Sequence, residues 1–218
     1  MGEPQSSRDL ILCRVAAAIG AKEGSPPPPP PASARFAARS TAAPDAEIAR
    51  MISEVERLSG RGRRVHDREE FAAVLDDLIR SEEIRTASFQ SHPLIQRYGI
   101  AELMEGRGVR TISPQGDRHD LAECDLGITV ADGALPETGS VLLRTTQGQP
   151  DLLSLLPRVH LALVAPSAIL ADLHQAFALA KADRHFVLVS GSSRTADIEK
   201  VLTLGVHGPK SFHVWVCD

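Results

Sequence analysis

Two short stretches combine glycines and polar side chains in patterns that suit binding of a small molecule. The first, Glu137-Thr138-Gly139-Ser140, places a carboxylate, two hydroxyls and a glycine between apolar segments. The second, Ser192-Ser193-Arg194-Thr195, follows an apolar run and carries three hydroxyls and a guanidinium. Glycine permits close approach of the backbone, and a guanidinium suits carboxylate or phosphate. The two stretches therefore predict a site for a small anionic ligand.

The second stretch also predicts an anion site on geometric grounds. An apolar strand at 186–189 leads into the turn, and the following pattern indicates a helix from Thr195 to Leu204. A helix N-terminus offers free N–H groups and a positive dipole end, and ligands of open α/β sheets sit beyond strand carboxyl ends. The alternative is simple helix capping, with Arg194 either solvated or paired to a nearby carboxylate such as Asp197 or Glu199.

Two further candidates are less specific. His207 and Gly208 follow the predicted helix, where a histidine in a turn is either structural or a donor and acid–base group. Glu137 is a candidate catalytic nucleophile or general base, although its segment could be only a turn. Neither stretch matches the glycine patterns of dinucleotide or nucleoside-triphosphate sites, so the sequence does not support nucleotide binding.

Composition excludes several classes of function. The net charge of −4, the pI near 6.1 and the 4% aromatic content argue against binding of nucleic acid. Cys13, Cys124 and Cys217 are far apart and lack metal-ligand spacing, and an iron–sulfur cluster needs about four thiolates. No signal-peptide pattern and no apolar run of membrane-spanning length is present, so a cytoplasmic location is expected.

Secondary-structure patterns position these loops on an α/β fold. Several predicted strands are apolar throughout, which is typical of a mostly parallel sheet with helices on both faces. The expected strands are 64–66, 85–89, 109–112, 141–143, 159–164, 186–189 and 212–216, and the expected helices are 44–58, 67–79, 94–105, 167–180 and 195–204.

The chain is expected to have three parts: a helical arm at 1–24, a proline-rich linker at 25–43 and a domain at 44–218. The arm has apolar residues at helical spacing within 7–21. Six consecutive prolines in the linker cannot continue a helix. The apolar stripe would therefore have to dock on the domain, on a second copy in a homodimer, or on a partner.

Four motifs in order resemble the LUD domain, and more closely the lactate-utilisation protein C family. They are Gly127-Ile128-Thr129, Glu137-Thr138-Gly139-Ser140, the segment 193–199 (SRTADIE) and the segment 204–209 (LGVHGP). The resemblance covers roughly residues 45–218. Residues 130–133 and 135–136 depart from the pattern expected around the first motif, which leaves the shape of that loop undetermined.

The resemblance implies a fold similar to ribose-5-phosphate isomerase and the CoA-transferase-like proteins. It implies a role in a three-component system that oxidises L-lactate to pyruvate, with iron–sulfur clusters only in partner subunits. This chain would then be a ligand-binding subunit without a cofactor. The alternative is a free-standing enzyme that acts on a phosphorylated or CoA-linked acid through Glu137.

Overall fold

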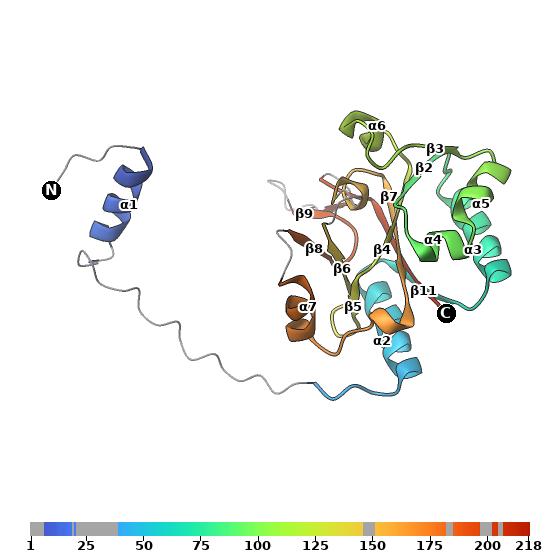
Figure 1. The fold of residues 1–218 in the computed structure, drawn as a ribbon, viewed down its shortest axis with the longest axis horizontal. Coiled ribbons are helices and arrows are strands. Elements are labelled where there is room, and N and C mark those ends of the chain that lie inside the picture. The colour runs from blue at the N-terminus through green and yellow to red at the C-terminus, as the bar shows by residue number, and fades with distance from the viewer. Residues whose placement is uncertain are drawn as a thin grey trace. The chain divides into compact units, whose positions relative to one another are not determined.

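The computed structural model describes residues 7–18, 20, 39–145, 151–181, 185–196, 202–204 and 207–218. The chain divides into two units, Met1–Ala37 and Ala38–Asp218. In the first unit, helix α1 (Ser7–Ala18) matches the predicted arm helix as far as its described residues extend (Figure 1). Leu12, which lies off the predicted apolar stripe, is exposed like Leu10, Ile11 and Val15. The apolar surface of α1 is therefore not confined to one stripe.

A six-stranded parallel sheet forms the centre of the second unit. Its strand order is β1-β11-β7-β4-β2-β3. Helices cover one face of this sheet, and a helix together with a smaller sheet covers the other face (Figure 1). The strands are β1 (Arg61–Val65), β2 (Thr86–Phe89), β3 (Arg110–Thr111), β4 (Leu126–Val130), β7 (Val159–Val164) and β11 (Ser211–Cys217). All residues of β4 and β7 are buried, because both faces of these central strands are covered. The predicted parallel α/β fold is confirmed.

Helices α3 (Arg68–Ser81), α4 (Pro93–Arg97) and α5 (Ile100–Gly106) cover one face of the sheet. Phe71 joins the layers there, since its ring centroid lies 4.7 Å from that of Tyr98 and 5.1 Å from that of Trp215. The predicted cap of α3 is confirmed, because the Asp67 carboxylate accepts the backbone N–H of Glu70 at 2.8 Å. The predicted helix 94–105 is divided at Gly99, whose φ of 63° is left-handed.

Helix α2 (Pro44–Arg57) and a three-stranded antiparallel sheet cover the other face. The small sheet contains β5 (Gly133–Leu135), β6 (Ser140–Arg144) and β8 (Phe186–Val189). The sequence assigned β8 to the parallel sheet, and that assignment is wrong. A four-residue turn at 136–139 joins β5 to β6, and so short a connection permits only antiparallel pairing. Strand β6 therefore pairs with β5 along one edge and with β8 along its other edge.

Arg39 belongs to this second unit although the sequence places it in the linker. Its guanidinium forms an ion pair with Glu47 of α2 at 2.6 Å and donates to the Ala171 carbonyl at 2.8 Å. Glu47 is buried, and its hydrogen bond to Arg39 holds the pKa of the carboxyl below its ordinary value. The chain is thus anchored to the body five residues before α2 begins.

The segment predicted as a helix from 167 to 180 is only partly helical. Residues Pro166–Ala168 form the 3₁₀ helix η2, and α7 (Leu173–Ala180) begins after the capping side chain of Asp172. Helical spacing would place Leu173 and Phe177 on the apolar face of this segment, yet they are 46% and 51% exposed. The small residues of α7, Ala176 and Ala180, are the buried ones, because they permit close approach of the helix to its neighbours.

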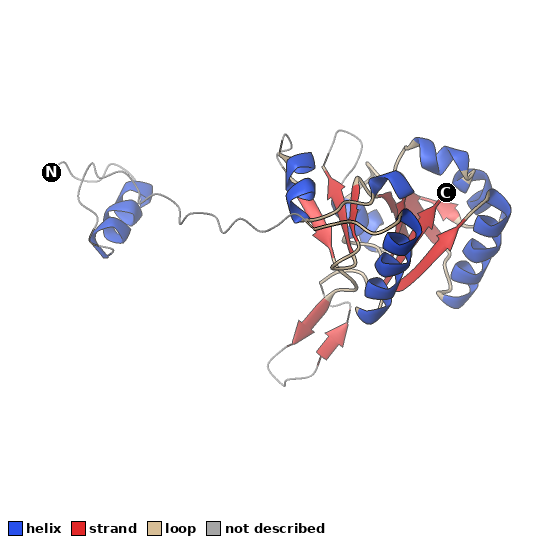
Figure 2. Cartoon of the chain, turned by 90° about the horizontal axis from the view of Figure 1, so that it is seen from below, coloured by secondary structure: helices blue, strands red, loops and turns tan. Residues whose placement is uncertain are grey.

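The helix predicted from Thr195 to Leu204 is also wrong. Strands β9 (Arg194–Ala196) and β10 (Leu202–Leu204) pair antiparallel instead, and this hairpin extends away from the other sheets in Figure 2. Thr195 lies opposite Thr203 in the register. Threonine is a β-branched residue that favours strands, and both segments fit a period of two.

Two histidines are buried in the main sheet. His160 of β7 is fully buried, with its Nε2 2.9 Å from the hydroxyl of Thr129. Burial lowers the pKa of His160 from 6.5 to about 3. His213 of β11 is also buried, and burial lowers its pKa to about 4 against the opposing effect of Glu82. Both side chains are therefore neutral in the folded protein at pH 7.

We expect the protein to lose stability as the pH falls below about 6.5. The unfolded chain takes up the His160 proton near pH 6.5, whereas the folded chain resists it down to about 3. Between pH 7 and pH 5 this difference should cost about 2 kcal/mol of unfolding free energy. The variant His160→Gln lacks this titrating group. The difference in unfolding free energy between the variant and wild type, measured with urea, should therefore change in favour of the variant by about 2 kcal/mol from pH 7 to pH 5. Parallel pH profiles for the two proteins would contradict this assignment.

Candidate functional site

The structure brings the first predicted polar stretch beside Ser190, which lies two residues before the second stretch. The Ser140 hydroxyl lies 2.6 Å from that of Ser190 and 2.8 Å from that of Thr138. The antiparallel register, in which Val141 lies opposite Val189, places these serines side by side. Ser140 is buried and Thr138 is exposed. A chain of hydroxyls therefore joins two exposed residues, Thr138 and Ser190, through the buried Ser140.

The glycines of these loops bring the backbone close to helix α2. A Cβ on Gly139 would lie 2.9 Å from backbone atoms of Glu54 and Val55, and the φ of this glycine is 59°. A Cβ on Gly191, whose φ is 98°, would lie 3.2 Å from the Leu58 carbonyl. Side chains at these positions would clash or be strained. The sequence predicted close approach to a ligand here, but the structure shows close approach to a helix.

Arg194 contacts the same end of α2. Its guanidinium donates a hydrogen bond to the Leu58 carbonyl, at the C-cap of the helix. The C-terminal end of a helix carries partial negative charge, so a cation is favourable there. The sequence argument instead placed Arg194 at a helix N-terminus, where a cation needs a counter-charge. That argument is wrong, because strand β9 begins at Arg194 and no helix begins there.

The loop that carries Arg194 lies at the amino-terminal edge of the main sheet. Leu58 lies three residues before the start of β1. The Ser193 N–H donates to the carbonyl of Pro209, which lies two residues before the start of β11. The sequence predicted the carboxyl edge, on the assumption that β8 belongs to the parallel sheet. Since β8 belongs to the small antiparallel sheet, its end points toward the opposite edge.

The remaining predicted residues are distributed around this junction. Gly208 packs on Ser193, because a Cβ there would lie 3.1 Å from the Ser193 Cβ. Ser192 is buried, whereas His207 is exposed. The Thr195 side chain and the whole of Asp197 lie outside the described residues.

Glu137 is exposed in the turn between β5 and β6. Catalytic carboxylates are usually desolvated or placed beside a specific charge partner, which perturbs their pKa. Its exposed position gives no support to a role as nucleophile or general base, so the prediction of an enzyme acting through Glu137 stays a prediction.

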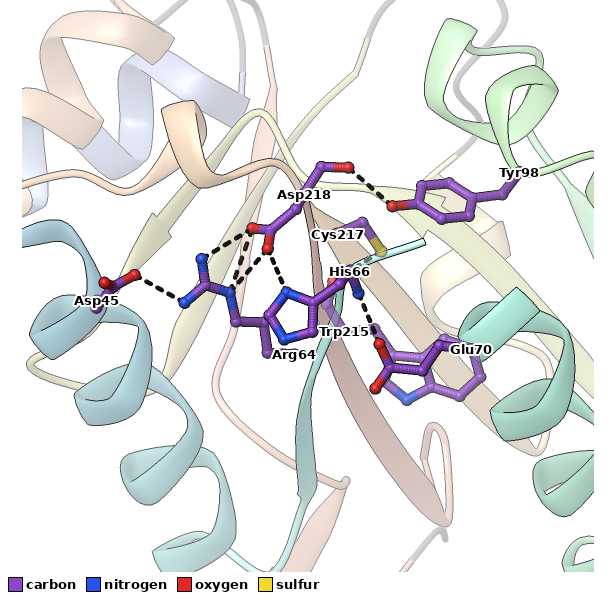
Figure 3. Close-up of polar contacts among 8 residues, drawn as sticks. All are labelled: Asp45, Arg64, His66, Glu70, Tyr98, Trp215, Cys217 and Asp218. Atoms are coloured by element: carbon purple, nitrogen blue, oxygen red, sulfur yellow. Dashed lines mark hydrogen bonds and ion pairs between the residues drawn. The ribbon is translucent and has the colours of Figure 1, made fainter. Parts of the chain in front are cut away.

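The sequence did not indicate a second polar cluster at the carboxyl ends of β1 and β11. Figure 3 shows the Asp218 carboxylate between His66 and Arg64, with Oδ2 2.7 Å from the His66 Nδ1 and 3.0 Å from the Arg64 Nε. The hydrogen bond from Arg64, assisted by that of His66, lowers the pKa of Asp218. Arg64 also pairs with Asp45 of α2 at 2.7 Å, and the Tyr98 hydroxyl donates to the Asp218 carbonyl at 2.9 Å.

This cluster orients an imidazole at the surface. The His66 side chain is 59% exposed, and the carboxylate holds one of its ring nitrogens. Such a pairing leaves the other nitrogen available for proton transfer or hydrogen bonding. Arg64 lies in β1 and His66 directly follows it, whereas Asp218 directly follows β11. These residues are far apart in the chain, and the parallel pairing of β1 with β11 brings them together.

The three cysteines are divided between the two units. Cys124 and Cys217 are buried, and Cys13 belongs to α1 in the other unit. Burial raises the pKa of Cys124, and it raises that of Cys217 to about 12. In the part of the chain that the structure describes, no three His, Cys, Asp or Glu side chains gather as metal ligands would. The described helices are all too short or too polar to span a bilayer.

Comparison with known proteins identifies relatives that are named Lactate utilization protein C. The chain is 32% identical over 156 residues to Lactate utilization protein C 1 of Bacillus mycoides, covering 65% of this chain and 67% of that protein. It is 36% identical over 104 residues to Lactate utilization protein C of an Exiguobacterium species, covering 44% and 45% of the two chains. The matched segments thus span about half to two thirds of the length of these relatives.

A solved structure shares the fold. The crystal structure of a DUF162 family protein from Deinococcus radiodurans superposes with a TM-score of 0.62 at 18% identity, covering 82% of this chain and all of that one. The LUD domain family model matches residues 48–216, which include most of α2, the main sheet as far as Val216 and both polar loops. The chain therefore belongs to the LUD domain family.

Proposed function

We propose that this protein is a component of a multi-subunit L-lactate utilisation system that oxidises L-lactate to pyruvate. Its role there is to bind a small anion, and it has no redox centre of its own. The observation that carries the proposal is the LUD domain match over 48–216, together with relatives named Lactate utilization protein C. The partners are the iron–sulfur components of the same system.

The number of cysteines supports a subunit without a cluster. An iron–sulfur cluster needs about four thiolates, whereas the sequence has three cysteines, of which Cys13 lies in the first unit and Cys124 and Cys217 in the second. We therefore assign electron transfer in the proposed system to the partner subunits.

The hydroxyl chain and Arg194 support the anion site. Thr138, Ser140 and Ser190 form linked hydrogen bonds, and the Ser193 backbone is fixed by Pro209. A guanidinium has five N–H donors, and the bond to Leu58 uses one of them. The site combines these donors at the amino edge of the main sheet.

Deletion of the gene should abolish growth on L-lactate as sole carbon source in a strain without another lactate dehydrogenase. Growth on pyruvate should be unchanged, because the proposed step precedes pyruvate, and a plasmid copy should restore growth on lactate. The measurement is the growth rate on each carbon source. Normal growth of the deletion strain on lactate would overturn the proposal.

Arg194→Gln should weaken binding of L-lactate roughly tenfold, the usual consequence of losing one charge-assisted hydrogen bond. It should also lower the unfolding free energy by about 1 kcal/mol, since the bond to the Leu58 carbonyl is lost. Calorimetric titration and urea unfolding measure the two effects.

Arg57→Gln is the matched control for Arg194→Gln. It removes the same charge near the end of α2, where Arg57 pairs with Glu54 at 2.7 Å on the surface. Lactate affinity should be unchanged in this control. If Arg194→Gln binds lactate as tightly as wild type while losing stability, Arg194 serves only the structure.

A further inference from the structure

The buried histidine His213 borders a cavity of about 270 Å³ at one side of the main sheet. Strand β1 ends the strand order there, and the cavity lies beside β1, β11 and α3, with the last turn of α2 completing its walls. None of the wall residues belongs to the polar stretches 137–140 and 192–195. The cavity is therefore a separate feature of the domain.

A chain of hydrogen bonds fixes the imidazole of His213. The Ser211 hydroxyl donates its one proton to the Glu82 carboxylate at 2.8 Å. The same hydroxyl oxygen lies 3.0 Å from the His213 Nε2, so it accepts a hydrogen bond from Nε2–H. The Nδ1 of the neutral ring is then an acceptor. Because burial lowers the pKa of His213 to about 4, this acceptor is unprotonated at pH 7.

The Nδ1 of His213 is accessible although the residue is only 4% exposed. Among the described residues, the fully enclosed side-chain atoms without a hydrogen-bond partner belong to Ser88, Gln90 and His160. The His213 Nδ1 also has no partner there, but it is not one of these enclosed atoms. Since His213 borders the cavity, an occupant of the cavity with an N–H or O–H donor can satisfy this nitrogen.

The wall beside His213 is apolar. Trp215 lies two residues further along β11 on the same face, and Val74 and Leu78 of α3 are buried near it in one core cluster. Such a surface suits the ring of a ligand. Cavities for drug-sized ligands begin at about 300 Å³, so this smaller cavity fits a single substituted ring.

Two guanidiniums with unused donors border the same cavity. Arg63 lies opposite Trp215 in the strand register, and alternation along the strand places Arg61 on the same face. Neither guanidinium donates a hydrogen bond within the part of the chain that the structure describes. Arg61 has only an ion pair with Glu82 at 3.7 Å, and Arg158 shares that carboxylate at 3.6 Å. The planar N–H groups suit a ligand carboxylate.

The two wall carboxylates do not cancel this positive charge. Asp77 pairs with Arg80 at 2.6 Å. Glu56 is exposed and has no ion pair among the described residues, so it offsets one guanidinium. Since Glu82 is shared between two arginines, the walls and their ion partners carry more guanidiniums than carboxylates. The balance favours an anionic group on the ligand.

We infer that this cavity binds a small aromatic carboxylic acid that carries a hydroxyl or N–H donor on its ring. The donor bonds to the His213 Nδ1, the ring lies against Trp215, and the carboxylate meets Arg61 and Arg63. This site does not depend on the role in lactate utilisation.

4-Hydroxybenzoate is the probe, because it combines the three features of the inferred ligand. Trp215 is the single tryptophan of the chain, so its fluorescence reports on the cavity. Titration of the full chain should change this emission saturably, with a Kd of roughly 1 mM or tighter.

Two analogues divide the binding into its parts. Benzoate lacks the donor and 4-hydroxybenzamide lacks the charge, so each should bind at least roughly threefold more weakly than 4-hydroxybenzoate. Absence of saturable binding of 4-hydroxybenzoate, or equal binding of either analogue, overturns the inference.

Charge variants on opposite walls should act with opposite signs. Arg63→Gln should weaken 4-hydroxybenzoate binding roughly threefold to tenfold, whereas Glu56→Gln should strengthen it roughly twofold. Both side chains are exposed, so these variants should fold. Arg118→Gln is the matched control, since it removes an exposed guanidinium of α6 (Arg118–Ala122), outside the cavity, and should leave the affinity unchanged. Unchanged affinity in Arg63→Gln contradicts the assignment.

His213→Phe tests the acceptor, because it keeps a buried ring and removes Nδ1. In the folded variant, 4-hydroxybenzoate should lose its advantage over benzoate, and a retained advantage would contradict the role of His213. If this variant does not fold, the comparison of the two compounds on wild type still decides the question. None of these results bears on growth with lactate, so the two proposals fail separately.

Discussion

Insertion of β11 between β1 and β7 is the constraint on which the rest of the structure depends. This strand pairs in parallel with both neighbours, and six of its seven residues are buried. Trp215 contributes to the core on one face and Phe212 to the core on the other. Its pairing with β1 joins residues about 150 positions apart, so this contact forms only when the whole domain folds.

The same strand organises both edges of the sheet. At its beginning, Pro209 accepts the Ser193 N–H and ties down the loop that carries Arg194. At its end, Asp218 places a carboxylate beside His66 and Arg64. The two edges differ in chemistry, since hydroxyls and a guanidinium gather at the amino edge, whereas a carboxylate with an imidazole and a guanidinium gathers at the carboxyl edge.

Helix α2 shows why motif residues need not all touch a ligand. Gly139 and Gly191 allow their loops to lie against its C-terminal half, and Arg194 binds its last carbonyl. Part of the polar motif pattern is therefore explained by packing against one helix. The serines between these contacts keep the hydroxyl groups on which the proposed anion site rests.

The sequence by itself determined the elements whose signals are local. Continuous apolar runs such as 159–164 indicated a buried parallel sheet, Asp67 indicated the start of α3, and ordered motifs indicated the LUD domain. Tertiary structure alone decided the pairing of β8 with β6, the hairpin that replaces a predicted helix after Arg194, and the meeting of His66 with Asp218. The incomplete bonding of Gln90 also depends on its surroundings in the fold. The physical reason is that periodicity reports which side of an element is apolar, whereas strand partners and buried polar contacts depend on segments far away in the chain.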